Sequence, residues 1–369
     1  MSEKLRVGVL MGGRSAEHEV SLRSAKNVVM ALNKEKYDVT LLGLNKQGEW
    51  FWYPNSMLDE LTDDPKTVAL PVPTAEQAVA IVPGREKSQF LRLSSPPQPF
   101  ELDVVFPVLH GTFAEDGTMQ GLLELTRVPY VGAGVLGSSV GMDKDIAKKL
   151  LRDAGIPSAK FMTVMRHQRE SISFGEVVET LGLPCFVKPA NAGSSVGVHK
   201  VSDAAGFQAA LDDAFQFDTK LLIEEAIVGR ELECSVLGNE FPEASIFGEV
   251  IPQNDFYSYE AKYLDENGAV LAIPAEMTNE QLTAGQELAI QTYQTLGLEG
   301  MSRVDVFLKE SDGTFIVNEV NTLPGFTAIS MYPKLWEVSG LPYSQLLDRL
   351  IELAVSRFTR QNNLTTNFF

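Results

Sequence analysis

The chain has 369 residues, which is long for a single hydrophobic core, so we expect two or three domains. A hydrophobic fraction of 44% with 22% charged residues is typical of globular proteins, while the net charge of −18 argues against nucleic acid or an anionic membrane as a partner. Only two cysteines occur, Cys185 and Cys234, which argues against a disulfide scaffold or a cysteine-based zinc site and fits a reducing compartment.

The chain opens with a strand, a glycine turn and a helix. The apolar run at residues 5–11 has strand length, Gly12 and Gly13 follow, and a helical pattern starts at Ser15. This is the opening of a doubly wound α/β unit. The run is too short for a signal peptide or a membrane span, so we expect a cytoplasmic protein. Glu17 lies at the β–α turn where such sheets bind ligands, although it is also placed to complement a helix dipole.

Two more strands are predicted in the first third of the chain, at residues 37–44 and 103–109. Residues 54–98 between them are proline-rich and irregular, which is typical of surface excursions with short elements. His110 directly follows the second of these strands and precedes a glycine, where binding sites are often built. A buried structural histidine is the alternative interpretation.

The glycines at 132, 134 and 137 formally match a dinucleotide-binding fingerprint. The preceding strand is very short, the motif is not in the first βαβ unit, and no ribose-binding acid ends a following strand. Close backbone packing at a domain junction is therefore the favoured interpretation. An amphipathic helix is predicted next, at residues 142–154, and Gly155 and Pro157 end it.

A loop of small residues, 190–195, lies between predicted strands at 185–188 and 196–201. Strand–loop–strand order is not that of a P-loop, but Gly193, Ser194 and Ser195 can still fold over phosphate oxygens with amide and hydroxyl donors. Lys188 adds a positive charge beside them. The alternative is a flexible hairpin tip.

The segment that follows suits a nucleotide base. A predicted edge strand at 221–227 can offer backbone groups to a flat base, and Glu231 is available to a ribose hydroxyl. The aromatic-rich residues 256–264 predict an ordered lid. Amphipathic helices are predicted at 281–296 and 343–358.

A β-hairpin at residues 303–321 carries the most informative polar pattern. Strands at 303–308 and 315–321 flank a three-residue loop, 311–313, in which Gly313 takes the left-handed position. That loop pairs residue 310 with residue 314, so Asp305 lies opposite Glu319, and Arg303 lies opposite Asn321. Two carboxylates and an amide on one face suit Mg²⁺, which takes oxygen ligands. A surface ladder of ion pairs is the alternative.

In their order along the chain these features resemble an ATP-grasp enzyme, and closely the D-alanine–D-alanine ligase family, from the first strand to about residue 356. The motifs that carry the resemblance are GGRSAEHEVS at 12–21, HGTFAEDGTMQG at 110–121, MDK at 142–144, FVKPANAGSSVGV at 186–198, YEAKY at 259–263, RVDVF at 303–307 and NEVNTLPGFT at 318–327. The resemblance implies an α/β ATP-grasp fold, in which an N-terminal doubly wound α/β domain (1–132) precedes two α+β domains (133–225 and 226–369) that clasp ATP. It also implies a lid loop at about 252–268.

The resemblance implies roles for particular residues. Catalytic roles fall to Glu17, Ser194, Tyr263, Arg303, Gly325 and Ser330. Contacts to D-alanine fall to Glu17, His110, Arg303, Ser330 and Met331, and metal ligation falls to Asp305, Glu319 and Asn321. Nucleotide contacts fall to Lys144, Phe186, Lys188, Ser194, Ser195, Glu224, Glu225, Ala226, Ile227, Glu231, Lys262, Asn318 and Glu319.

The reaction implied is ATP-dependent ligation of two D-alanine molecules through a D-alanyl phosphate, for peptidoglycan precursor synthesis. The implied cofactors are ATP, two Mg²⁺ or Mn²⁺ ions and K⁺, and the implied assembly is a homodimer. Another ATP-grasp carboxylate–amine ligase, a ligase that uses D-lactate as second substrate, and a non-catalytic nucleotide-binding module are the alternatives. Tyr263 beside Lys262 favours an amine acceptor, and the intact set of Arg303, Asp305 and Glu319 speaks against a mere binder.

Overall fold

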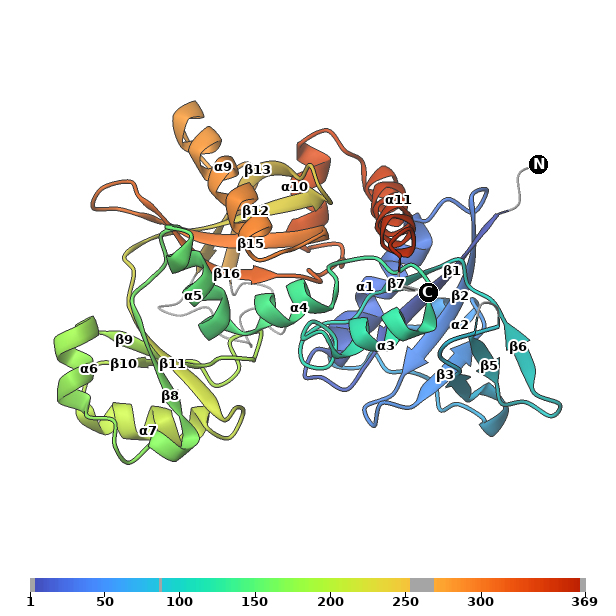
Figure 1. The fold of residues 1–369 in the computed structure, drawn as a ribbon, viewed down its shortest axis with the longest axis horizontal. Coiled ribbons are helices and arrows are strands. Elements are labelled where there is room, and N and C mark those ends of the chain that lie inside the picture. Colours follow the sequence, from blue (N-terminus) through green and yellow to red (C-terminus); the bar gives the residue numbers. More distant parts are fainter. Residues whose placement is uncertain (1–3, 86–87, 253–268, 366–369) are drawn as a thin grey trace.

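The computed structural model describes residues 4–85, 88–252 and 269–365. Their strands form four sheets, of four, three, four and five strands. Figure 1 shows the N-terminal sheet on one side of the molecule and a small four-stranded sheet on the other, with the five-stranded sheet and helices α4 and α5 between them. The predicted domain boundaries at residues 132 and 225 stay predictions.

The N-terminal sheet has the strand order β3-β2-β1-β7. Strand β1 pairs in parallel with β2 and β7, while β3 pairs with β2 in the antiparallel sense. Helix α1 and the C-terminal helix α11 belong to the same hydrophobic core as β1, and Figure 1 shows α11 returning to this end of the molecule. The bounds are β1 Leu5–Gly12, β2 Tyr37–Leu44, β3 Trp50–Tyr53, β7 Val104–Pro107, α1 His18–Ala31 and α11 Tyr343–Asn362.

A three-stranded antiparallel sheet occupies part of the segment predicted to be irregular. Its inward residues Val79 and Phe90 join a core that also contains Leu10, Leu42 and residues of helix α3. This excursion therefore covers the second face of the N-terminal sheet. The bounds are α2 Met57–Glu60, β4 Val79–Ile81, β5 Phe90–Arg92, β6 Gln98–Phe100 and α3 Thr118–Thr126.

The small sheet, of order β10-β9-β11-β8, is antiparallel throughout. Helices α6 and α7 supply Val177, Phe207 and Leu211 to its core. Strand β11 ends two residues before the predicted position, so residues 226 and 227 follow the strand as a connection to the next sheet. The bounds are β8 Phe161–Met165, β9 Cys185–Pro189, β10 His199–Val201, β11 Lys220–Glu225, α6 Phe174–Leu181 and α7 Ala204–Ala214.

The five-stranded sheet has the order β14-β13-β12-β15-β16. Helix α9 covers it and begins with a capping box between Thr278 and Gln281. Helices α4 and α5, which the predicted boundaries assign to the central domain, also belong to the core of this sheet. The bounds are β12 Gly229–Gly238, β13 Glu243–Pro252, β14 Ala269–Ala272, β15 Gly300–Lys309, β16 Phe315–Asn321, α4 Val135–Met142, α5 Lys144–Asp153, α9 Asn279–Thr295 and α10 Met331–Val338.

The glycine motif at 132–137 serves packing. Gly137 lies in helix α4, and a Cβ placed on it would lie 2.7 Å from the carbonyl oxygen of Gly297. A Cβ on Gly300 would lie 3.0 Å from the carbonyl oxygen of Gly132. Close backbone approach thus explains Gly137, as the sequence interpretation favoured over a dinucleotide site, while Gly132 has a φ of +99° and a Cβ on Gly134 would meet only the hydroxyl of Tyr130, at 4.0 Å.

The hairpin at 303–321 has the predicted pairing at its polar end. Asp305 lies opposite Glu319, and Arg303 lies opposite Asn321. Near the turn the register differs by one residue, because Lys309 pairs with Thr314 and the predicted pairing of 310 with 314 is wrong. A bulge opposite Asp305 and Val306 takes up the extra residue at Asn318. None of the helices in the described ranges is both long and apolar enough to span a bilayer.

Candidate active site

The polar end of the hairpin faces a cavity of about 190 Å³. The cavity lies where helix α1, the loop after β7 and the strands β15 and β16 meet. Residues from distant parts of the chain line it, among them Glu17, His110, Ser194, Arg303, Glu319, Asn321, Gly325, Ser330 and Met331, all of them predicted site residues. We call this the substrate cavity.

Arg303 is held by two carboxylates at the floor of the substrate cavity. Its Nε and Nη2 lie 2.7 Å from the two oxygens of Asp305, and its Nε lies 2.9 Å from Oε2 of Glu233. Burial alone would lower the pKa of Arg303, but the charges of Asp305 and Glu233 outweigh it and hold that pKa well above its usual range. The guanidinium therefore stays charged.

The oxygen atoms beside Arg303 fit a divalent cation. Asp305 is buried, and its Oδ2 accepts a hydrogen bond of 3.0 Å from the amide of Asn321, which leaves the amide oxygen of Asn321 available. The described residues hold no cluster of three His, Cys, Asp or Glu side chains in a metal-binding arrangement. Two carboxylates and an amide nevertheless suit Mg²⁺, which takes few protein ligands and completes its shell with water and substrate phosphates.

A second cavity, of about 250 Å³, lies between the small sheet and the five-stranded sheet. We call it the nucleotide cavity. Its lining includes Lys144, Phe186, Lys188, Ser194, Ser195, Glu224, Glu225, Ile227, Glu231, Asn318 and Glu319. Of the predicted nucleotide contacts in the described chain, only Ala226 does not line it. Lys262 and Tyr263, and nearly all of the predicted lid at 252–268, lie outside the described residues.

The two cavities meet at a shared wall. Lys144, Gly193, Ser194 and Glu319 line both. Lys144 Nζ donates to the carbonyl of Ala192 at 2.8 Å and lies 3.2 Å from Oε2 of Glu319. A phosphate at this wall would lie between a lysine and the side-chain oxygen atoms of the hairpin.

The loop after β9 reaches across to helix α1. Ser194 and Ser195 have φ of 53° and 58°, a left-handed backbone that non-glycine residues rarely adopt. Consecutive amides in turned backbone of this kind can form an anion-binding concavity. The hydroxyl of Ser194 donates to Oε1 of Glu17 at 2.5 Å, so the loop is tied to the N-terminal sheet.

A buried ion-pair network lies at the far end of the nucleotide cavity. Oε2 of Glu224 lies 2.7 Å from Nζ of Lys188, and its Oε1 lies 3.3 Å from Nζ of Lys148. Burial would raise the pKa of Glu224, but the charges of Lys148 and Lys188 outweigh it and lower that pKa. The carboxylate is therefore held ionised, ready to accept hydrogen bonds.

Among the charged residues that the sequence interpretation missed are Glu115 and Glu233, which line the substrate cavity, and Lys148, which pairs with Glu224 of the nucleotide cavity. Lys148 follows Lys144 by four positions and so shares its helix face, a signal that was available. Glu233 follows Glu231 by two positions in β12, and alternation along a strand gives them one face. Glu115 lies within the HGTFAEDGTMQG motif at 110–121, which carries the resemblance, so that motif was its signal. Glu115 lines the substrate cavity and accepts a hydrogen bond of 2.9 Å from the amide of Gly111.

Glu115 should make the stability of the protein depend on pH. Burial, and next the charge of Glu17, raise the pKa of Glu115 from 4.5 to about 8. The folded protein then keeps a proton that the unfolded chain releases, so the free energy of unfolding falls between about pH 4.5 and pH 8, by at most about 1.4 kcal/mol per pH unit. Urea unfolding across this window should show a steeper fall for the wild type than for Glu115→Gln. Parallel pH curves would contradict the prediction.

The arrangement defines a class of enzyme. A small antiparallel sheet and a larger sheet enclose a lysine-lined nucleotide cavity, and metal-type ligands lie at its inner wall, as in an ATP-grasp ligase. Two sequence profiles match the chain, described as D-ala D-ala ligase N-terminus at residues 6–133 and D-ala D-ala ligase C-terminus at residues 150–352.

Named relatives agree with these profiles. The chain is 53% identical over 364 residues to a D-alanine–D-alanine ligase of Oceanobacillus iheyensis, with 99% of each chain covered. It is 51% identical over 364 residues to D-alanine–D-alanine ligase A of Escherichia coli, again with 99% of each covered. The chain belongs to the D-alanine–D-alanine ligase family, which confirms the resemblance and the ATP-grasp fold.

Solved structures show the same fold. The D-alanine–D-alanine ligase from Coxiella burnetii superposes with a TM-score of 0.84 at 37% identity, covering 98% of this chain and 97% of that one. The VanG D-Ala:D-Ser ligase from Enterococcus faecalis superposes with a TM-score of 0.82, also at 37% identity, covering 95% of this chain and 100% of that one. Relatives of similar fold thus differ in the second amino acid that their names give.

Proposed function

We propose that this protein joins two D-alanine molecules into D-alanyl-D-alanine at the expense of ATP, through a D-alanyl phosphate, and so supplies a peptidoglycan precursor. The observation that carries the proposal is the shared wall of the two cavities, where Lys144, Ser194 and Glu319 lie beside both. A carboxylate in the substrate cavity can there attack the γ-phosphorus of a nucleotide in the neighbouring one. Phosphoryl transfer requires positioning and charge neutralisation more than covalent catalysis.

Residues of the substrate cavity can hold both amino acids. Glu17 takes the ammonium group of the first D-alanine, and Ser194 holds the Glu17 carboxylate in place. Arg303 and the amide of Gly325 face the oxygen that becomes negative when the second amine attacks the acyl phosphate. Ser330 and Met331 open helix α10, whose N-terminal amides suit the carboxylate of the second D-alanine.

His110 lines this cavity, and both of its ring nitrogens are bonded to the protein. Its Nδ1 lies 2.9 Å from the carbonyl of Leu323, and its Nε2 lies 3.1 Å from the hydroxyl of Ser24. Burial lowers the pKa of His110, which favours the neutral ring. Because both ring nitrogens are bonded to the protein, His110 can contact the substrate by van der Waals packing but not by a hydrogen bond from its ring.

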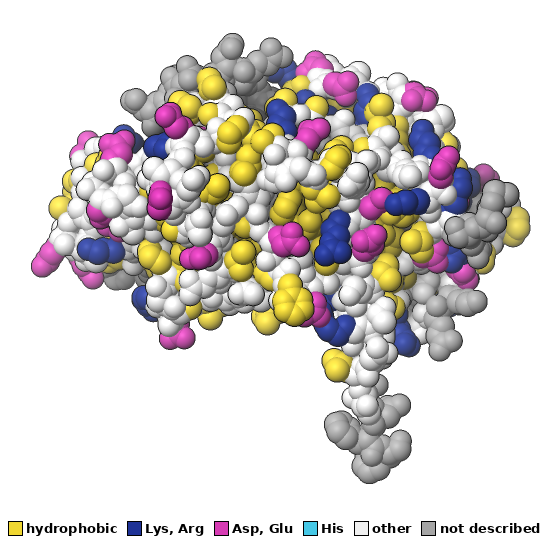
Figure 2. Space-filling view, turned by 90° about the horizontal axis from the view of Figure 1, so that it is seen from above, with side chains coloured by type: hydrophobic (Ala, Val, Ile, Leu, Met, Phe, Trp, Pro, Cys, Tyr) yellow, Lys and Arg dark blue, Asp and Glu magenta, His cyan; other side chains and the backbone are white. Residues whose placement is uncertain are grey.

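The cofactors and assembly follow from the same proposal. Asp305, Glu319 and Asn321 would hold two Mg²⁺ or Mn²⁺ ions, which when bound neutralise the charge that moves among the phosphates. We also propose a requirement for K⁺, a homodimer and a cytoplasmic location, together with a nucleotide-binding role for Lys262 and a catalytic role for Tyr263. On the face that Figure 2 shows, acidic and basic side chains are interspersed, which supports small molecules rather than nucleic acid as partners.

The test is a coupled assay with MgATP and D-alanine. We expect one phosphate and one ADP per dipeptide, and ATP turnover without dipeptide would end the proposal. The alternatives are separated by offering D-serine or D-lactate with D-alanine at neutral pH. Dipeptide from D-alanine alone should dominate, whereas faster formation of the D-alanyl-D-serine or D-lactate product would assign the protein to the neighbouring activity.

A further inference from the structure

In the loop between β16 and α10, hydrogen bonds fix the backbone of Leu323 before Gly325 and of Phe326 after it. Residue 324 is a proline and has no amide hydrogen, so the amide of Gly325 is the first donor after that of Leu323. The Gly325 amide makes no hydrogen bond to another residue in the described ranges, and Gly325 lines the substrate cavity. The amide and carbonyl of Leu323 before it and the amide of Phe326 after it are hydrogen-bonded, and these partners come from the N-terminal part of the chain.

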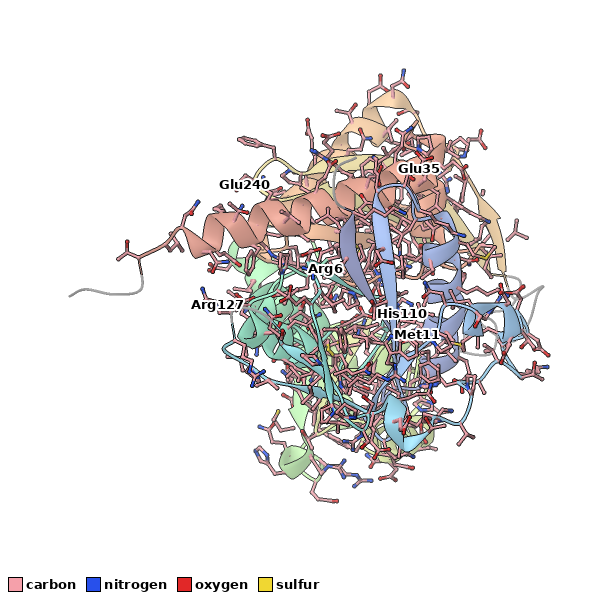
Figure 3. All side chains as sticks on the ribbon, turned by 90° about the vertical axis from the view of Figure 1, so that its right-hand side faces the viewer. Arg6, Met11, Glu35, His110, Arg127 and Glu240 are labelled. Carbon is pink, nitrogen blue, oxygen red and sulfur yellow. The ribbon has the colours of Figure 1, made fainter. Side chains whose placement is uncertain are left out.

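Leu323, before the proline, is held through both of its backbone polar groups. Its carbonyl accepts from Nδ1 of His110 at 2.9 Å, and its amide donates to Oε2 of Glu115 at 3.5 Å. His110 and Glu115 lie on the same loop, the one that follows β7. This loop starts where β7 pairs with β1, since the amide of Val108 donates to the carbonyl of Leu10 at 3.0 Å, and Figure 3 labels His110 and Met11 in this part of the molecule. The N-terminal sheet therefore anchors this peptide.

The peptide after Gly325 is held by helix α1. The amide of Phe326 donates to the hydroxyl of Ser24 at 3.2 Å, and that hydroxyl lies 3.1 Å from Nε2 of His110. Because the carbonyl of Leu323 can only accept, Nδ1 of His110 carries the hydrogen, and Nε2 of the neutral ring accepts from Ser24. One chain of hydrogen bonds thus runs from Phe326 through Ser24 and His110 to Leu323.

We propose that Ser24, His110 and Glu115 are positioning residues that aim the Gly325 amide at the reacting oxygen, by fixing the peptides on both sides of it. We call these three residues the clamp. The inference rests on the oxyanion role of Gly325 in the proposed function. A donor that stabilises charge must already point at the place where the charge develops, since an amide that has to reorient during the reaction loses much of its effect.

Docking of the loop does not depend on the clamp. The ring of Phe326 packs edge-on against Phe106, with ring centroids 5.9 Å apart, and lies 5.7 Å from the ring of Tyr332. Its carbonyl also accepts from the hydroxyl of Tyr343 at 3.2 Å. Removing one hydroxyl from the clamp should therefore leave the loop in place but its amides less precisely directed.

The experiment compares Ser24→Ala with Ser21→Ala. Both serines are fully buried on α1 and both accept from a backbone amide, but Ser21 binds Gly12 and Val108 and does not contact the loop. Rapid-quench single turnovers with MgATP and D-alanine measure ADP and dipeptide separately, and hydroxylamine traps the acyl phosphate. For Ser24→Ala we expect ADP formation within about twofold of wild type and dipeptide formation about 10- to 100-fold slower, with acyl phosphate accumulating. Ser21→Ala should leave both steps unchanged.

A second pair of variants, His110→Asn and His110→Ala, tests whether the rate of dipeptide formation follows the hydrogen bond to Leu323. Asn at position 110 can place an amide near Nδ1 and still donate to Leu323, so His110→Asn should slow dipeptide formation less than His110→Ala. Equal slowing of both steps in Ser24→Ala, or no slowing, would overturn the clamp while leaving the proposed function standing. A wild-type enzyme that forms no dipeptide would overturn both.

Discussion

Replacing Arg303 with lysine should lower kcat by about 10²- to 10³-fold while the protein stays folded. The guanidinium bridges Asp305 at 2.7 Å and Glu233 at 2.9 Å and still lines the substrate cavity. A lysine keeps the positive charge, so the two carboxylates are not left buried without a partner, a change that typically costs about 3–5 kcal/mol. It cannot reproduce a planar fork that holds both acids and also faces the oxyanion.

Arg230→Lys is the matched control. Arg230 also forms a two-pronged pair, with Glu249 at 2.9 Å and 2.6 Å, on the same sheet but outside both cavities. The kcat of the Arg230→Lys variant should match that of the wild type. Thermal unfolding of both variants separates loss of chemistry from loss of fold. If Arg303→Lys kept its kcat within a few fold, Arg303 would be a structural ion-pair residue and not an oxyanion donor.

The polar end of the hairpin could be predicted from the sequence because alternation along a strand is a local rule. Asp305 and Glu319 lie opposite each other as expected, although the loop is a residue longer and Asn318 bulges to restore the register. The predicted loop was one residue too short and the bulge was not predicted, and these two errors cancel at Asp305 and Glu319. A bulge cannot be counted from a sequence, since it depends on how the flanking strands twist and pack.

Contacts between remote segments could not be predicted. Glu115 meets Leu323 across 208 positions, and Ser24 meets Phe326 across 302. Helix α11 was recognised by its periodicity, but nothing in that pattern says that its apolar face returns to the N-terminal sheet. Helices α4 and α10 were not predicted; the buried face of α4 consists mainly of Gly137, Ser138 and Gly141, which give no apolar pattern. Their positions follow from packing that only the assembled fold defines.

Glu319→Gln should be nearly as damaging as the arginine change, and its defect should depend on the metal. Glu319 lines both cavities and lies opposite Asp305, with Nζ of Lys144 at 3.2 Å. Glutamine has almost the same size but no charge, so it is a weaker ligand for a hard cation. Loss of groups that merely support a ligand lowers metal affinity by about 10- to 100-fold, so loss of a ligand itself should lower it by at least about 100-fold.

The measurement is the rate of ADP formation as a function of Mg²⁺ concentration. For Glu319→Gln the half-saturating Mg²⁺ concentration should rise, and high Mg²⁺ should restore part of the rate because Asp305 and Asn321 remain. Glu310→Gln, on the exposed turn of the same hairpin, removes an equal charge from the protein and should leave the Mg²⁺ curve unchanged. If the Mg²⁺ curve of Glu319→Gln were unshifted, the hairpin acids would neutralise Arg303 and Lys144 and hold no cation. That outcome would favour the ion-pair ladder that the sequence left as an alternative.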